Sequence, residues 1–159
     1  MAFRESLGMR LRSAYLSMHR CFQAHCDKFG VTADQFVVLT LLAEEDGIIQ
    51  KELVRRTYSD ANTIAALVGL LEKKGLVRRM RHEDDGRAWC VYLTPQGRRR
   101  QRELARSTEA LHRQLREAVS PEDMPTLLRC LQRIAEVMAP PRESKKNRVP
   151  VSTRSVPCA

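Results

Sequence analysis

Four arginines lie close together in a segment whose pattern predicts two short strands joined by a turn. Arg78, Arg79 and Arg81 lie in the first strand-like run, and Arg87 follows the Asp-Asp-Gly turn at 84–86. A guanidinium group is always charged in proteins and matches phosphate oxygens through paired hydrogen bonds. Cations gathered on a hairpin therefore favour the binding of a polyanion.

The net charge of +9 is confined to two parts of the chain. Residues 76–106 hold nine arginines against four carboxylates, a net charge of +5, and residues 140–159 hold five cations against one carboxylate, or +4. The rest of the chain is neutral. This distribution is typical of a nucleic-acid-binding protein, although a solvated arginine-rich face has the same composition.

No grouping of residues predicts catalysis, a cofactor or a bound metal. The chain has no nucleophile–base–acid set and no glycine-rich phosphate loop, so we expect no enzymatic activity. Its five cysteines are scattered and none forms a Cys-x-x-Cys pair. We expect Cys21, Cys26 and Cys130 to fill packing positions, whereas Cys90 and Cys158 occupy places where exposure is plausible.

Apolar periodicity predicts two helices in the first quarter of the chain. A stripe at steps of three or four residues runs through 3–29 and ends before Gly30. Thr32 and Gln35 form a capping-box pattern at the start of a second, buried helix. Ile48–Ile49 predicts a very short strand after it.

A helix pair and a hairpin follow. Residues 50–56 predict a short helix, and Ser59 or Asp60 is placed to cap the next helix, which runs to Lys74. Residues 76–81 and 89–93 predict two strands joined by a tight turn.

Two further helices complete the ordered part of the chain. Thr94–Pro95 starts a long polar helix, and Ser120–Pro121 repeats this pattern before a last apolar stripe that reaches Met138. Residues 140–159 are basic and rich in proline and serine, which predicts a disordered tail.

The predicted fold is mainly α with a small β-hairpin wing. A winged helix-turn-helix spans about residues 32–95 within a single domain at 1–139. Helices at about 3–29 and 95–138 flank it, and their apolar stripes cannot be buried within one small subunit. They are therefore predicted to form a homodimer.

Membrane association and export are not expected. No stretch approaches the roughly 18 uninterrupted apolar residues that a spanning helix requires. The first 13 residues carry several charges and no apolar block of signal-peptide type. These features predict a cytoplasmic protein.

The order and spacing of these elements resemble the multiple-antibiotic-resistance-regulator (MarR) family. The resemblance covers about residues 5–138 and rests on the segments at 50–53, 67–77, 85–87 and 91–97. It implies a triangular dimer with interlocked terminal helices. Family members bind palindromic operators, commonly as repressors, and many release DNA on binding small aromatic acids or on cysteine oxidation.

Candidate base contacts lie at the start and middle of the second helix of the motif. Asn62 and Thr63 can bond to base edges, since asparagine pairs well with adenine. Ala65 and Ala66 can pack on thymine methyl groups but cannot donate to guanine. Base reading is therefore expected to be sparse, with the wing and DNA shape supplying more of the specificity. Ser59, just before the helix, completes this set.

The hairpin supplies the remaining DNA candidates. Arg78, Arg79 and Arg81 are predicted phosphate contacts. The resemblance implies that Arg87 is the wing-tip arginine, which can reach into the adjacent narrow groove. It also implies that Asp85 holds the Arg87 guanidinium through a charge-assisted hydrogen bond.

The favoured function is a dimeric, sequence-specific DNA-binding transcription regulator, a repressor relieved by a small aromatic ligand. Tyr15, Met18 and Phe22 are candidate ligand contacts, with core packing as the competing interpretation. One alternative is a winged-helix protein-interaction module whose basic tail binds acidic partners. Another is a thiol-based redox-sensing regulator, in which Cys21 or Cys26 responds to peroxide.

Overall fold

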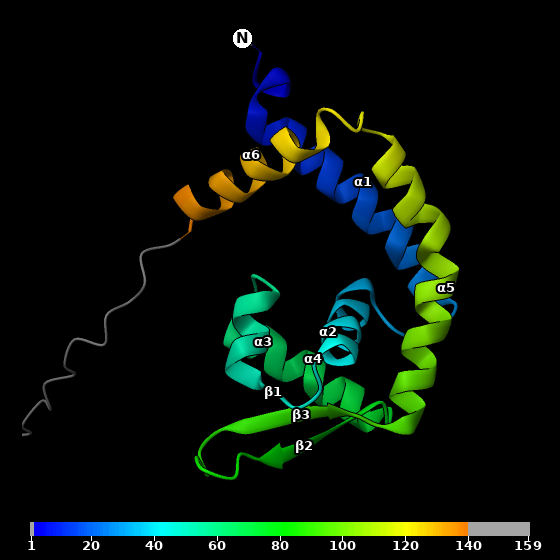
Figure 1. Ribbon diagram of the computed structural model, residues 1–159, viewed down its shortest axis with the longest axis vertical. Coiled ribbons are helices and arrows are strands. Elements are labelled where there is room, and N and C mark those ends of the chain that lie inside the picture. The colour runs from blue at the N-terminus through cyan, green and yellow to red at the C-terminus, as the bar shows by residue number, and fades with distance from the viewer. Residues whose placement is uncertain (1, 140–159) are drawn as a thin grey trace, which may run out of the picture. The chain divides into compact units, whose positions relative to one another are not determined.

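The computed structural model describes residues 2–139, and the predicted basic tail at 140–159 lies outside the described residues. The elements are η1 (Phe3–Glu5), α1 (Leu7–Asp27), α2 (Ala33–Glu44), β1 (Ile48–Ile49), α3 (Gln50–Arg56), α4 (Ala61–Lys73), β2 (Val77–Arg81), β3 (Trp89–Leu93), α5 (Pro95–Glu117) and α6 (Met124–Val137) (Figure 1). They divide after Ala118 into two compact units. The mainly helical winged fold predicted from the sequence is confirmed.

The first helix begins later than its apolar stripe predicts. Phe3–Glu5 form a separate 3-10 turn, and Ser6 then caps α1 by accepting a hydrogen bond from the N–H of Met9 at 3.4 Å. The helix ends at Asp27, and Gly30 follows with a φ of +69°. This left-handed conformation lets the chain turn back into α2 without the steric penalty of a Cβ atom.

The capping box predicted for the second helix is present, and one of its residues also contacts the end of α4. The Thr32 hydroxyl oxygen accepts from the N–H of Gln35 at 3.1 Å, and Gln35 Oε1 accepts from the N–H of Thr32 at 3.2 Å. The same Oε1 accepts from Lys74 Nζ at 3.1 Å, and Lys74 also donates to the Gly30 carbonyl at 2.6 Å. The buried Gln35 therefore connects the start of α2 to the end of α4.

Three antiparallel strands form one sheet in the order β1-β3-β2, with β3 in the centre. Ile48 pairs with Val91 on one side of β3, and Arg79 pairs with Val91 on the other. The hairpin of β2 and β3 lies below α2, α3 and α4 in Figure 1, and its turn projects beyond them. The helices therefore lie against one end of the sheet, while the hairpin turn is left to the solvent.

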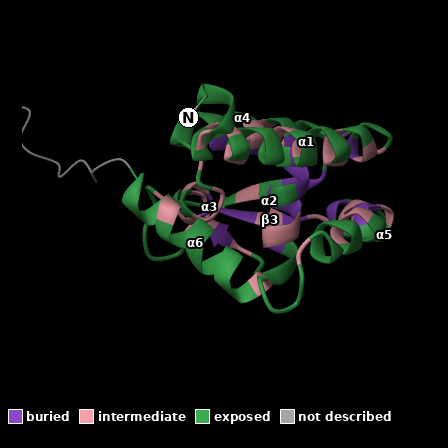
Figure 2. Ribbon diagram, turned by 90° about the horizontal axis from the view of Figure 1, so that it is seen from above, coloured by how far each residue is buried: buried purple, intermediate pink, exposed green. Residues whose placement is uncertain are grey.

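The core of the first unit lies between the helices and the central strand. Buried ribbon is concentrated on α2 and β3 (Figure 2). Every other element of this unit except η1 also contributes buried side chains, among them Cys26, Ile48, Leu53, Ile64, Val68, Leu71, Val77 and Leu104. Apolar residues from α1 to α5 meet here, so the relative placement of α4 and the hairpin depends on the whole unit.

The second unit, residues 119–139, contains a turn and α6. The sequence places the start of this helix at Ser120, but α6 begins at Met124. The Ser120 hydroxyl accepts from the N–H of Asp123 at 3.2 Å, so the serine closes a turn before the helix. No residue of α6 is buried, and exposed apolar side chains run along it: Leu127, Leu128, Leu131, Val137 and Met138.

The start of α5 passes unusually close to the turn between α4 and β2. Thr94 caps α5 by accepting from the N–H of Gly97 at 3.0 Å, and its hydroxyl donates to the Gly75 carbonyl at 2.6 Å. A Cβ atom on Gly97 would lie 1.9 Å from the carbonyl oxygen of Leu76. Only glycine therefore allows α5 to leave the winged domain in this direction.

We predict that Gly97→Ala lowers the free energy of unfolding by about 3 kcal/mol, the upper range for a clash in a packed site. The obstructing atom is backbone, so it cannot move aside as a flexible side chain would. Urea unfolding of the two proteins measures the difference.

Gly69→Ala is the matched control, because a Cβ atom there meets nothing within 4 Å. It should stabilise α4 by about 0.5–1 kcal/mol through helix propensity. If Gly97→Ala also raised stability, α5 would not be held at this crossing.

Candidate nucleic-acid interface

The start of α4 is organised by one carboxylate. Asp60 Oδ1 accepts from the backbone N–H groups of Asn62 and Thr63, both at 2.9 Å, and Oδ2 accepts from the Thr63 hydroxyl at 2.6 Å. Of the two capping residues considered from the sequence, Asp60 takes the role. Ser59 is half-buried beside it, and its N–H bonds to the Val54 carbonyl at 3.2 Å.

These contacts favour the charged form of the Asp60 carboxyl. The hydrogen bond from the Thr63 hydroxyl, followed by that from the Thr63 N–H, holds the pKa of Asp60 below its usual range. A carboxyl whose pKa is lowered by folding stabilises the folded state above its unfolded pKa. That stabilisation is lost as the pH falls through the folded pKa. The cap of α4 is therefore intact at neutral pH.

The side chains of α4 divide into a buried and an exposed face. Ile64, Val68 and Leu71 point into the core. The exposed face carries the residues predicted to meet the bases: Asn62, Thr63, Ala65 and Ala66. Between Ala61 and Leu71 this face carries no acidic residue, so the nearest carboxylates are the capping Asp60 before it and Glu72 after it.

All three arginines of β2 lie near aromatic rings of β3, and for Arg78 and Arg81 no ion pair is found among the described residues. The Arg81 guanidinium carbon lies 3.9 Å from the ring centroid of Trp89, its cross-strand neighbour, and Nη1 donates to the Gly86 carbonyl at 2.9 Å. Arg78 lies 5.6 Å from the centroid of Tyr92. Cation–π contact restrains these side chains while leaving their charge accessible.

The third hairpin arginine has a carboxylate partner. Arg79 Nη2 and Nε donate to Glu72 Oε2 at 2.6 and 3.0 Å. Its charge is therefore compensated within the subunit, which was not visible in the sequence because Glu72 belongs to α4.

The hairpin tip differs in one detail from the expected arrangement. The prediction that Asp85 binds the Arg87 guanidinium was wrong for this structure: Asp85 Oδ1 accepts from the backbone N–H of Arg87 at 3.0 Å. The turn is closed further by His82, whose Nδ1 accepts from the N–H groups of Asp84 and Asp85 at 3.2 and 3.3 Å. Asp85 thus shapes the tip backbone, and the exposed Arg87 side chain extends from it.

Two arginines at the start of α5, Arg98 and Arg100, hold the fold together. Arg98 forms an ion pair with Asp46, whose other oxygen accepts from the N–H of Leu93 at 2.9 Å. Arg100 donates to the Phe29 carbonyl and lies 3.4 Å from Glu103. These contacts tie α5 to the α1–α2 and α2–β1 connections.

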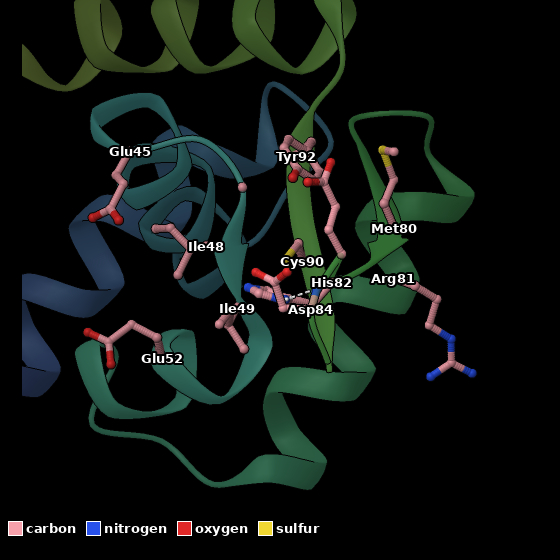
Figure 3. Close-up of a pocket in the computed structure, with 12 residues that line it drawn as sticks. Glu45, Ile48, Ile49, Glu52, Met80, Arg81, His82, Asp84, Cys90 and Tyr92 are labelled. Atoms are coloured by element: carbon pink, nitrogen blue, oxygen red, sulfur yellow. Dashed lines mark hydrogen bonds between the residues drawn. The ribbon is translucent and has the colours of Figure 1, made fainter. Parts of the chain in front are cut away.

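A cavity of about 490 Å³ opens between β1, the start of α3 and the hairpin (Figure 3). Glu45 and Glu52 lie on its wall, and Arg56 pairs with both, at 2.6 and 2.8 Å. Arg81 points away from the cavity. The hydrogen bonds from Arg55 and Arg56 lower the pKa of Glu52 to about 2.

The three candidate ligand contacts lie elsewhere, on α1. Tyr15 is 53% exposed and Met18 is 36% exposed, whereas Phe22 packs against the core. The Phe22 ring lies 4.8 Å from the imidazole of His112 on α5. Packing therefore accounts for Phe22, and the exposed Tyr15 and Met18 remain free within the subunit to receive another molecule.

The cysteines follow the sequence expectation only in part. Cys26 is fully buried, and desolvation, with a smaller contribution from Asp27, raises its pKa to about 11. Cys90 is only 5% exposed, so the exposure considered plausible for it was wrong. It lies on the central strand, paired with Ile49 on one side and Met80 on the other. Cys21 and Cys130 are exposed within the subunit, and Cys158 lies outside the described residues.

The burial of Cys26 weakens the case for a thiol sensor at this residue. A reactive thiolate requires a lowered pKa and access to solvent, and Cys26 has neither. His25, next to it in sequence, directs Nδ1 to the carbonyl of Cys21 at 3.0 Å. Within residues 2–139, no group of histidine, cysteine or acidic side chains is arranged to hold a metal ion. No described helix is long and apolar enough to cross a membrane.

We predict that Cys26 and Cys90 resist alkylation by iodoacetamide at pH 8 in the folded protein. Burial excludes the reagent from both, and the raised pKa keeps Cys26 protonated. Peptide mass spectrometry before and after unfolding in urea measures the protection. Rapid labelling of Cys26 in the folded protein would contradict its burial and reopen the sensor hypothesis.

The capped α4, the short α3 before it and the arginine-bearing hairpin together define a winged helix-turn-helix protein. The MarR family model matches residues 31–89. The transcriptional regulator SarZ of Staphylococcus haemolyticus is 32% identical over 102 residues, which cover 56% of this chain and 69% of SarZ. This chain therefore belongs to the MarR family of transcriptional regulators.

Solved structures agree over a larger part of the chain. BpsR of Bordetella bronchiseptica, whose DNA binding is regulated by 6-hydroxynicotinic acid, matches with a TM-score of 0.77 and 26% identity, covering 86% of this chain and 97% of BpsR. The repressor CouR, from Rhodococcus jostii RHA1, bound to a 23-mer DNA duplex, matches with a TM-score of 0.73 and 29% identity, covering 82% and 93%. Family membership favours DNA binding over a protein-interaction role.

Proposed function

We propose that this chain is a homodimeric repressor that binds a palindromic duplex operator through α4 and the hairpin of each subunit. The observation that carries the proposal is the exposed, uncharged first part of α4 beside a hairpin with four arginines. A helix fits the major groove, and a flanking basic hairpin reaches the phosphates and the next groove. CouR, a repressor whose structure was solved bound to a DNA duplex, has the same fold, which supports this proposal.

The α4 residues take different parts in this proposal. Asn62 is exposed, and its side-chain amide has no hydrogen-bond partner among the described residues, so it is free to read an adenine edge. The Thr63 hydroxyl already donates to Asp60, which leaves its methyl group and lone pairs for DNA. Ala65 and Ala66 offer small apolar contacts for thymine methyl groups.

Contacts at the ends of the reading surface complete the interface. Ser59 lies at the end of α4 that also presents Asn62, and we assign its hydroxyl to a phosphate oxygen. Arg78 and Arg81 are assigned to phosphates as well, with their rings limiting the side-chain entropy lost on binding. Arg87 is assigned to the narrow groove, because the turn closed by Asp85 presents it beyond the strands.

We predict that Arg87→Ala weakens binding to the operator by about 1–3 kcal/mol and binding to scrambled DNA by less, as expected of a groove contact. Arg87→Lys keeps the charge but loses the guanidinium fork, so it should recover phosphate attraction without full selectivity. Fluorescence titration against the duplex that the wild-type protein enriches from a random library, and against its scrambled version, measures both.

Arg106→Ala is the matched control for this pair, since it removes the same charge from an exposed position on α5. Equal losses on both duplexes for Arg87→Ala would assign Arg87 to a phosphate. A wild-type protein that enriched no duplex, or whose affinity ignored salt, would refute DNA recognition as the function.

The homodimer is proposed from apolar surface that the subunit leaves uncovered. At the start of the chain, Phe3 of η1 and Leu7 of α1 are exposed, and α6 exposes the leucines and terminal apolar residues already named. Exposure of this extent on two amphipathic helices is typical of an interface rather than of a monomer surface. A second copy of the chain would bury it and place two α4 helices on one duplex.

We predict that Leu131→Glu converts the protein from dimer to monomer at micromolar concentration, because it places a charge within the apolar face of α6. Thr126→Glu is the control, since it adds the same charge on the other side of the helix. Sedimentation velocity distinguishes the two. A wild-type protein that sediments as a folded monomer would remove the basis for a palindromic site.

Ligand control is proposed for the exposed part of α1. Tyr15 and Met18 present a ring and a thioether, which suit a small planar aromatic acid, and Phe22 lies one turn further along the helix. The regulation of BpsR by 6-hydroxynicotinic acid makes such a ligand the first class to test. Binding there would act on α1, which packs against α2 and α5 and so reaches the winged domain.

A further inference from the structure

One carboxylate near the end of α4 holds the first strand of the hairpin by three hydrogen bonds. Glu72 Oε1 accepts from the backbone N–H of Arg79 at 3.2 Å, and Oε2 accepts from Arg79 Nη2 and Nε. The two side chains are 36% and 32% exposed, so the pair is partly shielded from water. These bonds hold the pKa of the Glu72 carboxyl below its usual range.

This contact differs from the other ion pairs of the described chain. Among residues 2–139, the Glu72–Arg79 pair alone joins α4 to the hairpin. Because it engages both the backbone and the guanidinium of Arg79, it restrains the strand as well as the side chain. The guanidinium carbon also lies 5.7 Å from the ring centroid of Trp89 on β3, so the restraint extends to the second strand.

Because Glu72 is negatively charged, its two possible roles predict opposite changes in DNA affinity when it is removed. A carboxylate beside a DNA-binding surface repels phosphates, so its removal should strengthen binding to any duplex if charge alone matters. If Glu72 instead sets the geometry of the binding surface, its removal should lower the selectivity for the operator. Without it, the base-reading helix and the wing no longer keep one spacing, and the cognate site loses more than a scrambled one.

We propose that Glu72 is a positioning residue that, through Arg79, fixes the hairpin against α4 and thereby sets the selectivity of the protein for its operator. In this proposal Arg79 connects the hairpin to α4 and does not contact a phosphate. The inference rests on the proposed function, in which α4 and the hairpin engage one duplex. Since α4 has few groups that can read bases, the spacing between helix and wing carries a large share of recognition.

The test uses Glu72→Gln, Arg79→Gln and the double variant in the full-length protein. Glu52→Gln is the matched control, because it removes a paired carboxylate from α3 in the same unit without touching the hairpin. Affinities for the duplex most enriched by the wild-type protein and for its scrambled version are measured over a range of salt. The emission of Trp89, the single tryptophan of the chain, is recorded in the free proteins.

In both single variants, the ratio of the affinity for the enriched duplex to that for the scrambled duplex should fall about tenfold. The double variant should lose no more than either single variant, because the two residues act through the same interaction. Glu72→Gln should bind the scrambled duplex at least as well as the wild type, and Arg79→Gln should keep the wild-type salt slope. Trp89 emission should change in all three variants and not in Glu52→Gln. Arg79→Lys, which keeps the charge without the paired bonds, should give an intermediate ratio.

Three results would overturn the inference. A salt slope reduced by about one in Arg79→Gln, with equal losses on both duplexes, would make Arg79 a phosphate contact. An unchanged affinity ratio in Glu72→Gln, or in Arg79→Lys if Glu72→Gln does not fold, would remove the positioning role. A wild-type protein without preference for any duplex would instead refute the proposed function, which separates the two failures.

Discussion

The crossing of α5 over the turn between α4 and β2 is the constraint on which the arrangement of the first unit depends. Thr94 accepts from Gly97 and donates to Gly75, so one side chain both starts α5 and holds the turn beneath it. The missing Cβ of Gly97 lets the two backbones approach. From this point α5 carries Leu104 into the core and continues along α1, which links the reading surface to the helix face proposed for dimerisation.

The partners of the individual arginines, more than their number, decide how much positive charge is available to DNA. The hairpin and the start of α5 carry eight of the 19 arginines in residues 2–139, yet several of them neutralise carboxylates or bind carbonyls within the subunit. Arg87 at the tip and Arg78 on its tyrosine keep their charge for another molecule. Fewer cations are therefore available to DNA than the net charge of +9 implies, and those that are available are held in defined places.

The exposed face of α4 offers few side chains that can bond to bases, so more of the recognition depends on the geometry of the binding surface. Two alanines occupy the middle of the exposed face of α4, so few hydrogen bonds to bases are possible there. The Asp60 cap, the Glu72–Arg79 pair and the closed hairpin turn all fix backbone positions instead. Such a surface suits a site recognised through groove width and the spacing of contacts.

The sequence by itself determined the helices, the hairpin, the capping box of α2 and the family, because these depend on periodicity and on residues close together in the chain. It also indicated the exposed set on α4. Only the tertiary structure decided which arginines are free, since Glu72 and Asp46 reach their partners across the fold. It likewise buried Cys90, because the pairing of β1 with β3 makes an apparent edge strand the central one. Contacts between distant segments depend on packing, and local patterns do not encode it.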